Sequence, residues 1–226
     1  MTAPVSGPAD VPSRPPFRRT LVARPPYGPI GLFLLVLLLL AAGTGWYLFT
    51  RPRLVFTNQL AAPIRIAGGE DTPLTLAPGE TIRKTMSGSR AFVAQWELIR
   101  PLSADGRPMG SEVRGSVVVR APSGTVRRSA SARGSDADYF APLITNAGAD
   151  LLRIVVNAGL EGSLDCGCAV RPGAHRVFIG YYPLFQNSTV RARTPDGRAA
   201  TFRNLGPNVT AADGSVGLRF ESADLR

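Results

Sequence analysis

The sequence predicts an all-β extracytoplasmic region that follows one N-terminal transmembrane helix. We expect this region to hold two tandem Ig-like or β-sandwich-type modules related by internal duplication. Three observations lead to this prediction: an uncharged apolar run near the N-terminus, landmarks that recur in the same order along the chain, and short strand-like segments bounded by Gly and Pro turns. The chain has 226 residues, of which 44% are hydrophobic and 19% charged, a composition typical of globular proteins.

Residues 1–29 contain eight of the twenty prolines. Proline fixes φ and removes a backbone donor, so this segment is unsuited to a helix or a central strand. We expect a disordered cytoplasmic tail with polyproline II character. The pairs Pro15-Pro16 and Pro25-Pro26 occur in adaptor ligands, and the alternative is a solvated tail.

Residues 30–49 carry no charge, and Trp46 and Tyr47 lie near the end of this run. At ~1.5 Å rise per residue a helix of this length matches the ~30 Å hydrocarbon core of a bilayer. The sequence therefore predicts a single-pass signal anchor with interfacial aromatic residues. A cleaved signal peptide, with small residues at Ala41 and Gly43, is the alternative; the long leader and long apolar core favour the anchor.

The flanking charges predict the orientation of the anchor. Segment 10–24 carries four arginines and one aspartate, whereas only Arg51 and Arg53 follow the span closely. The positive-inside rule then places the N-terminus in the cytoplasm and the rest of the chain outside the cell membrane. Lys84 is the only lysine among 26 basic residues, a bias typical of GC-rich bacterial genomes, so we expect a cell-envelope protein.

An internal repeat divides the exported part into a first module, 51–121, and a second module, 139–226. Four landmarks recur in the same order, and the second copy gains about six residues around 160–168. Duplicated modules are the natural interpretation, and we expect Asn58 to superpose on Asn146 and Pro78 on Pro172. The landmark pairs are Thr57-Asn58-Gln59 with Thr145-Asn146-Ala147, Ile64-Arg65-Ile66 with Leu152-Arg153-Ile154, Pro78-Gly79 with Pro172-Gly173, and Asp105-Gly106-Arg107 with Asp196-Gly197-Arg198.

Short segments rich in β-branched and aromatic residues predict the strands of each module. In the first module they are 54–56, 63–66, 81–85, 91–99 and 116–119; in the second they are 141–145, 152–156, 174–179, 189–193, 199–202 and 216–220. Residues 122–138 are rich in Ser, Ala, Gly and Arg, which predicts a linker or mobile loop between the modules. Arg127, Arg128 and Arg133 would there meet an anionic surface or lie in a solvated loop.

Cys166-Gly167-Cys168 lies in the segment that the second module gains. An exported pair favours a disulfide, but residues two apart in a strand are ~6.6 Å apart, so a bridge requires a bend at Gly167. A Cu(I) site of both thiolates with His175 is a second hypothesis. Two buried apolar cysteines are a third.

The pair Cys166 and Cys168, followed by Pro172-Gly173, resembles the pattern of membrane-anchored copper-delivery proteins of cytochrome oxidase assembly. The resemblance covers about ten residues together with the topology of one span and an exported β-sandwich, and it implies Cu(I) delivery. The chain departs from that family in several respects. Gly167 replaces an aromatic residue, the spacing to Pro172 is shorter, a further upstream cysteine is lacking, and that family has no duplicated module.

The run Gly180–Phe185 concentrates aromatic side chains beside a proline. Tyr181, Tyr182 and Phe185 are candidates for a partner-binding surface, because tyrosine is favoured at interface hot spots. The alternative is that they form the edge of the second module's core, with the tyrosine hydroxyls reaching water.

Together these patterns predict a non-enzymatic binding or scaffold protein of the cell envelope, with no cofactor. No ordered acid, base and nucleophile and no phosphate-binding loop can be assembled from the sequence. The alternative is a thiol-based Cu(I)-binding or copper-delivery protein. Expected partners are the lipid bilayer through residues 30–49, other envelope proteins and anionic surface polymers. The dispersed charge of +10 does not predict nucleic-acid binding.

Overall fold

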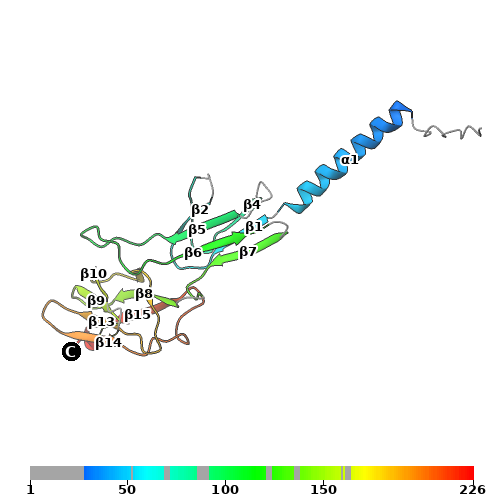
Figure 1. The fold of residues 1–226 in the computed structure, drawn as a ribbon. Helices are drawn as coiled ribbons and strands as arrows, with labels where there is room; N and C mark the ends of the chain where they lie inside the picture. The colour runs from blue at the N-terminus through cyan, green and yellow to red at the C-terminus, as the bar shows by residue number, and fades with distance from the viewer. Residues whose placement is uncertain are drawn as a thin grey trace, which may run out of the picture. The chain divides into compact units, whose positions relative to one another are not determined.

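The computed structural model describes residues 28–51, 53–68, 72–85, 92–120, 124–134, 138–158, 160 and 164–226. The expected proline-rich tail therefore lies almost wholly outside the described residues. The chain divides into two compact units, Met1–Trp46 and Tyr47–Arg226. The first contains most of one helix, and the second contains the β-rich region (Figure 1).

Helix α1 runs from Pro29 to Thr50 and is apolar on all sides. Within it, Pro29–Tyr47 is long and apolar enough to cross a membrane, and no second helix of this kind occurs in the described residues. Its large apolar side chains are 46% (Leu37) to 76% (Ile30) exposed. Water does not favour such a helix, whereas a bilayer would cover it on every side. The prediction of one N-terminal apolar helix is confirmed.

The first half of the β region, β1 to β7, forms two sheets. One has the order β4-β1-β7, in which β1 pairs antiparallel with β4 and parallel with β7; the other has the order β3-β2-β5-β6. Alternate residues of the strands point into the space between the sheets. The strands are β1 (Arg53–Asn58), β2 (Ile64–Gly68), β3 (Leu74–Leu76), β4 (Thr81–Thr85), β5 (Phe92–Leu98), β6 (Arg114–Val119) and β7 (Thr125–Ala130).

The second half, β8 to β15, repeats this pairing order. Strand β8 pairs antiparallel with β11 and parallel with β15, as β1 pairs with β4 and β7, and the other sheet has the order β10-β9-β13-β14. Strand β12 is an addition that pairs with β8. The strands are β8 (Tyr139–Asn146), β9 (Leu152–Val156), β10 (Leu164–Val170), β11 (Val177–Phe178), β12 (Tyr182–Pro183), β13 (Val190–Arg193), β14 (Ala199–Phe202) and β15 (Ser215–Phe220), followed by a 3-10 turn, Ser222–Asp224.

Each half buries its own apolar core between its two sheets, and Figure 1 shows the strands of each half gathered as a group. The cores are not fully separate. Ala141 and Tyr181 of the second half belong to the first core, and Met109 of the first half belongs to the second core. The prediction of an all-β region after the helix is therefore confirmed, and the two halves contact each other through exchanged side chains.

Two buried asparagines close equivalent corners of the two halves. Asn58 ends β1 and Asn146 ends β8, and they are 0% and 1% exposed. Each side-chain amide bonds to carbonyl groups of the next loop and of a facing strand, and each Oδ1 accepts the backbone N–H two residues on. The distances are Asn58 Nδ2 to Ala62 O 2.9 Å and to Leu76 O 3.1 Å, Asn146 Nδ2 to Asp150 O 2.8 Å and to Val170 O 3.0 Å, Leu60 N to Asn58 Oδ1 3.0 Å, and Gly148 N to Asn146 Oδ1 3.0 Å.

The Pro-Gly turns meet these asparagines in the same way. Gly79 N–H donates to Asn58 O at 2.8 Å, and Gly173 N–H donates to Asn146 O at 2.9 Å. The predicted equivalence of Asn58 with Asn146 therefore agrees with the hydrogen bonds. Both residues are more deeply enclosed than turn asparagines usually are.

The prediction of a linker at 122–138 is wrong for its central part. Residues 125–130 form β7, which pairs along its whole length with β1. As an edge strand β7 exposes Arg127 and Arg128, so its composition lacks the apolar alternation of an inner strand. Residues 135–137 lie outside the described residues.

Replacing either asparagine by alanine should destabilise the β region by about 2–4 kcal/mol, because several buried backbone groups lose their partner together. Urea unfolding of N58A and N146A measures this. N208A, on an exposed loop, is the matched control and should change the free energy of unfolding by less than about 0.5 kcal/mol. A cost for N58A or N146A as small as the control would contradict a structural role for the buried amides.

Candidate functional site

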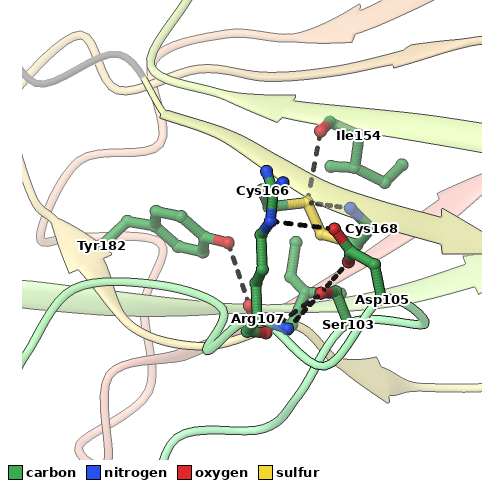
Figure 2. Close-up of a disulfide and its surroundings, with 8 residues drawn as sticks. Ser103, Asp105, Arg107, Ile154, Cys166, Cys168 and Tyr182 are labelled. Atoms are coloured by element: carbon green, nitrogen blue, oxygen red, sulfur yellow. Dashed lines mark hydrogen bonds and ion pairs between the residues drawn. A yellow bond between two sulfur atoms is a disulfide. The ribbon is translucent and has the colours of Figure 1, made fainter.

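Cys166 and Cys168 form a disulfide within strand β10 (Figure 2). Strand β10 is an edge strand, and its register against β9 shifts between Asp165 and Ala169. The three residues 166–168 therefore stand opposite the single residue Ile154. This bulge shortens the separation of the two cysteine Cα atoms to 5.1 Å, and Gly167 makes the bend with φ +61°. The bend that the sequence requires for a bridge is thus present at Gly167.

The bridge lies on the core side of the strand. Both cysteines are buried in the second core, together with Ile154 and Met109. Cys168 N–H donates to Cys166 Sγ at 3.2 Å, and this sulfur lies 3.2 Å from Ile154 O. Figure 2 also draws Arg107, from the turn between β5 and β6, in the surroundings of the bridge. A buried bridge of this kind stabilises the bulge and presents little sulfur to a reaction partner.

The Cu(I) hypothesis does not fit this arrangement. It requires two free thiolates and a nitrogen ligand, whereas the two sulfurs are bonded to each other. His175 is exposed in the turn that follows β10. Among the described residues there is no group of three His, Cys, Asp or Glu side chains that would hold a metal ion.

Of the two interpretations of Tyr181 and Tyr182, the partner-binding surface is wrong and the core edge is correct. Both residues are 0% exposed, because the apolar rings fill the two cores. Phe185, the third candidate, is 37% exposed, so the run places one aromatic ring at the surface. The sequence could not separate an aromatic platform from an aromatic core edge.

Tyr181 instead joins the two halves. Its ring lies in the first core, and its hydroxyl accepts the N–H of Ala61 at 2.7 Å and donates to the carbonyl of Asp213 at 2.6 Å. Ala61 lies between β1 and β2, whereas Asp213 precedes β15. Burial raises the pKa of Tyr181 well above its ordinary value of 10.0. The hydroxyl is therefore a neutral, fully used hydrogen-bonding group between the halves.

Two glycines allow the backbones of the halves to touch beside Tyr181. A Cβ at Gly110 would lie 2.8 Å from Tyr181 O, and one at Gly180 would lie 2.9 Å from Gly110 Cα. Ser111 N–H donates to Tyr181 O at 2.7 Å across this contact. Both glycines have positive φ, +75° and +109°, so neither the space nor the backbone suits another residue.

A basic groove, which the sequence did not predict, lies on the outward face of the sheet β4-β1-β7. Its volume is about 500 Å³, and its lining contains no carboxylate. Two other grooves flank Trp96, but there the charges pair: Arg65 with Glu97 at 3.4 Å and Arg114 with Glu112 at 3.3 Å. The lining of the basic groove is Arg53, Val55, Thr57, Arg83, Lys84, Thr85, Thr125 and Arg127.

A sequence signal for this groove existed in the alternation of Arg53, Val55 and Thr57, which places all three on one face of a strand. This signal becomes informative only with the position of β7, because the sequence alone predicts a linker at Arg127.

No protein-family model matches the chain, and no curated protein matches it.

Thiol counting under denaturing, non-reducing conditions should find no reactive thiol, because both cysteines are bonded. After reduction it should find two. The closed loop is tiny, so the loss of stability on reduction should stay below the ~3 kcal/mol that loop entropy gives a 15-residue loop. Two thiols before reduction would remove the disulfide, and Cu(I) uptake by that form would revive the metal hypothesis.

Replacing Tyr181 by phenylalanine should destabilise the protein by about 1–3 kcal/mol, because Ala61 N–H and Asp213 C=O lose a buried partner. The wild type should also lose stability above pH 10. There the unfolded tyrosine releases its proton while the folded one, whose pKa is raised, retains it. The slope contributed by Tyr181 is about 1.4 kcal/mol per pH unit, and Y181F should lack this contribution. Urea titrations at pH 7 to 11 measure both effects.

Y182F is the matched control, because the Tyr182 hydroxyl donates to Ile179 O within the second half, at 2.9 Å. It should lower stability without changing the contact between the halves. A Y181F protein that keeps the full alkaline slope of the wild type would contradict the buried neutral hydroxyl.

Proposed function

We propose that the chain is a single-pass, membrane-anchored protein whose β region works outside the cytoplasm as a non-enzymatic binding or scaffold unit. The observation that carries this proposal is helix α1, whose large apolar side chains are uncovered along its length. The positive-inside bias supports a cytoplasmic N-terminus. The disulfide supports an oxidising compartment for the β region.

We also infer that the two halves are copies of one β-sandwich module, produced by duplication. The shared strand order and the matching contacts of Asn58 and Asn146 support this inference. So do two equivalent turns, in which Ser103 and Thr194 hydroxyls bond to Asp105 and Asp196. The Ig-like form of the module stays a prediction. A scaffold role suits such a pair, because tandem modules offer several faces on a rigid frame.

An alkaline phosphatase fused after Arg226 should be active, because this enzyme requires export. A fluorescent protein that folds only in the cytoplasm should stay dark at the same place. The chain should remain in the membrane pellet after alkaline extraction. The variant L37R/L38R places two charges at the centre of the span, at a cost of about 2.5–3.5 kcal/mol each, and should abolish membrane retention. The paired control L37A/L38A should retain it.

Three results would contradict the proposal. They are a bright fluorescent fusion together with an inactive phosphatase fusion, release of the wild type by alkaline extraction, and a mature N-terminus near Thr44. The last would show that the helix is a cleaved signal peptide.

A further inference from the structure

The outward face of the sheet β4-β1-β7 places arginines on both sides of β1. The strand registers put Arg83 and Arg127 opposite the same residue, Val55. Neighbouring strands lie about 4.8 Å apart, so the Cα atoms of these arginines are about 10 Å apart. Arg53 lies on the same face of β1, two residues before Val55. The three arginines therefore lie around Val55, the one apolar residue in the lining of the groove.

The lining of the groove offers hydrogen-bond donors and cations, and it contains no carboxylate. Arg53, Arg83 and Arg127 form no ion pair with any residue that the structure describes. Thr57, Thr85 and Thr125 add hydroxyl groups to the lining. Guanidinium forks together with hydroxyls are the groups that bind phosphate oxygens in proteins. The chemistry of the groove thus fits a phosphate ester.

The same face of the second half serves a different purpose. In the equivalent row, Leu143 stands opposite Phe178 on one side and Gly217 on the other. Leu143 is buried, and Phe178 packs against the first core. The second copy therefore uses this face to dock on the first copy. In the first copy the equivalent positions on either side of Val55 are Arg83 and Arg127. These cations exclude an apolar partner and favour an anionic one.

We propose that this basic face binds the phosphate headgroups of anionic phospholipids in the bilayer that α1 crosses. The proposal rests on the membrane anchoring proposed above. Arg53 follows Thr50, the last residue of α1, by three positions, so at most about 11 Å of extended chain separates them. Arg51, in between, lies over the ring of Tyr47 at 4.4 Å. The covalent tether thus keeps the start of the face within reach of the headgroups of its own bilayer, whatever the orientation of the sheet.

Arginine-specific labelling tests this proposal on the full chain. The protein is reconstituted into nanodiscs of phosphatidylcholine, with or without added phosphatidylglycerol, treated with phenylglyoxal and digested for mass spectrometry. Labelling of Arg53, Arg83 and Arg127 should slow about fivefold when phosphatidylglycerol is present. This is the factor by which an anionic surface strengthens the binding of one cation. High salt should restore the rate, because it screens the attraction. Equal rates in both nanodiscs would overturn the proposal.

A pair of variants supplies the matched control. R83Q/R127Q removes two cations of the basic face and should reduce the phosphatidylglycerol retained by the detergent-purified chain about 25-fold in native mass spectrometry. R153Q/R193Q removes two exposed arginines that face each other across β9 and β13 in the second half. This second variant should retain phosphatidylglycerol as the wild type does. If both variants lost phosphatidylglycerol equally, retention would depend on net charge alone, and the proposal would be overturned.

A soluble poly(glycerol phosphate), added to nanodiscs of phosphatidylcholine alone, separates lipid from envelope polymer. Stronger protection of the three arginines by this polymer than by phosphatidylglycerol would assign the face to a polymer and overturn the lipid proposal. Failure of the chain to enter nanodiscs would overturn the anchoring itself. Insertion with unchanged labelling would overturn only the headgroup site.

Discussion

The hydroxyl of Tyr181 is the group on which the arrangement of the β region depends. It is buried, and it has both a donor and an acceptor partner only while the two halves touch: Ala61 belongs to the first half and Asp213 to the second. Separation of the halves would break the bond from Ala61 and the close backbone contact of Gly110 with Gly180. The two modules are therefore docked to each other through specific backbone and side-chain contacts, although each has its own core.

This docking makes the two copies unequal. The second copy buries the outward face of β8 against the first core, with Ala141 as part of that core. The first copy does not dock through this face, so Arg53, Arg83 and Arg127 on the outward face of the sheet β4-β1-β7 stay exposed and form no ion pair with the described residues. This docking explains why β1 and β8, which have the same place in the two halves, differ in the residues on their outward faces. It also leaves the cationic face on the copy that follows the membrane helix directly in the chain.

The sequence predicted the elements whose signal is local. The apolar helix, strands β4, β9 and β14, and the bend at Gly167 follow from composition, alternation and turn residues alone. It missed β7 and β10, because an edge strand with exposed arginines and a bulged strand with a glycine both lack regular alternation. It also missed β3 and β12, which have three and two residues and are too short to show a pattern. The burial of Tyr181 depends on contacts about 120 positions away in the chain, which no local pattern reports.

Native-state hydrogen exchange of the full chain tests the docking most directly. Amides of β5, in the first half, and of β13, in the second, should open with the same free energy in the wild type, because unfolding of one half breaks the Tyr181 junction and destabilises the other. Their denaturant dependence should also be the same. A second half that opens at clearly lower denaturant, while β5 keeps its full protection, would show two independent modules and contradict the account.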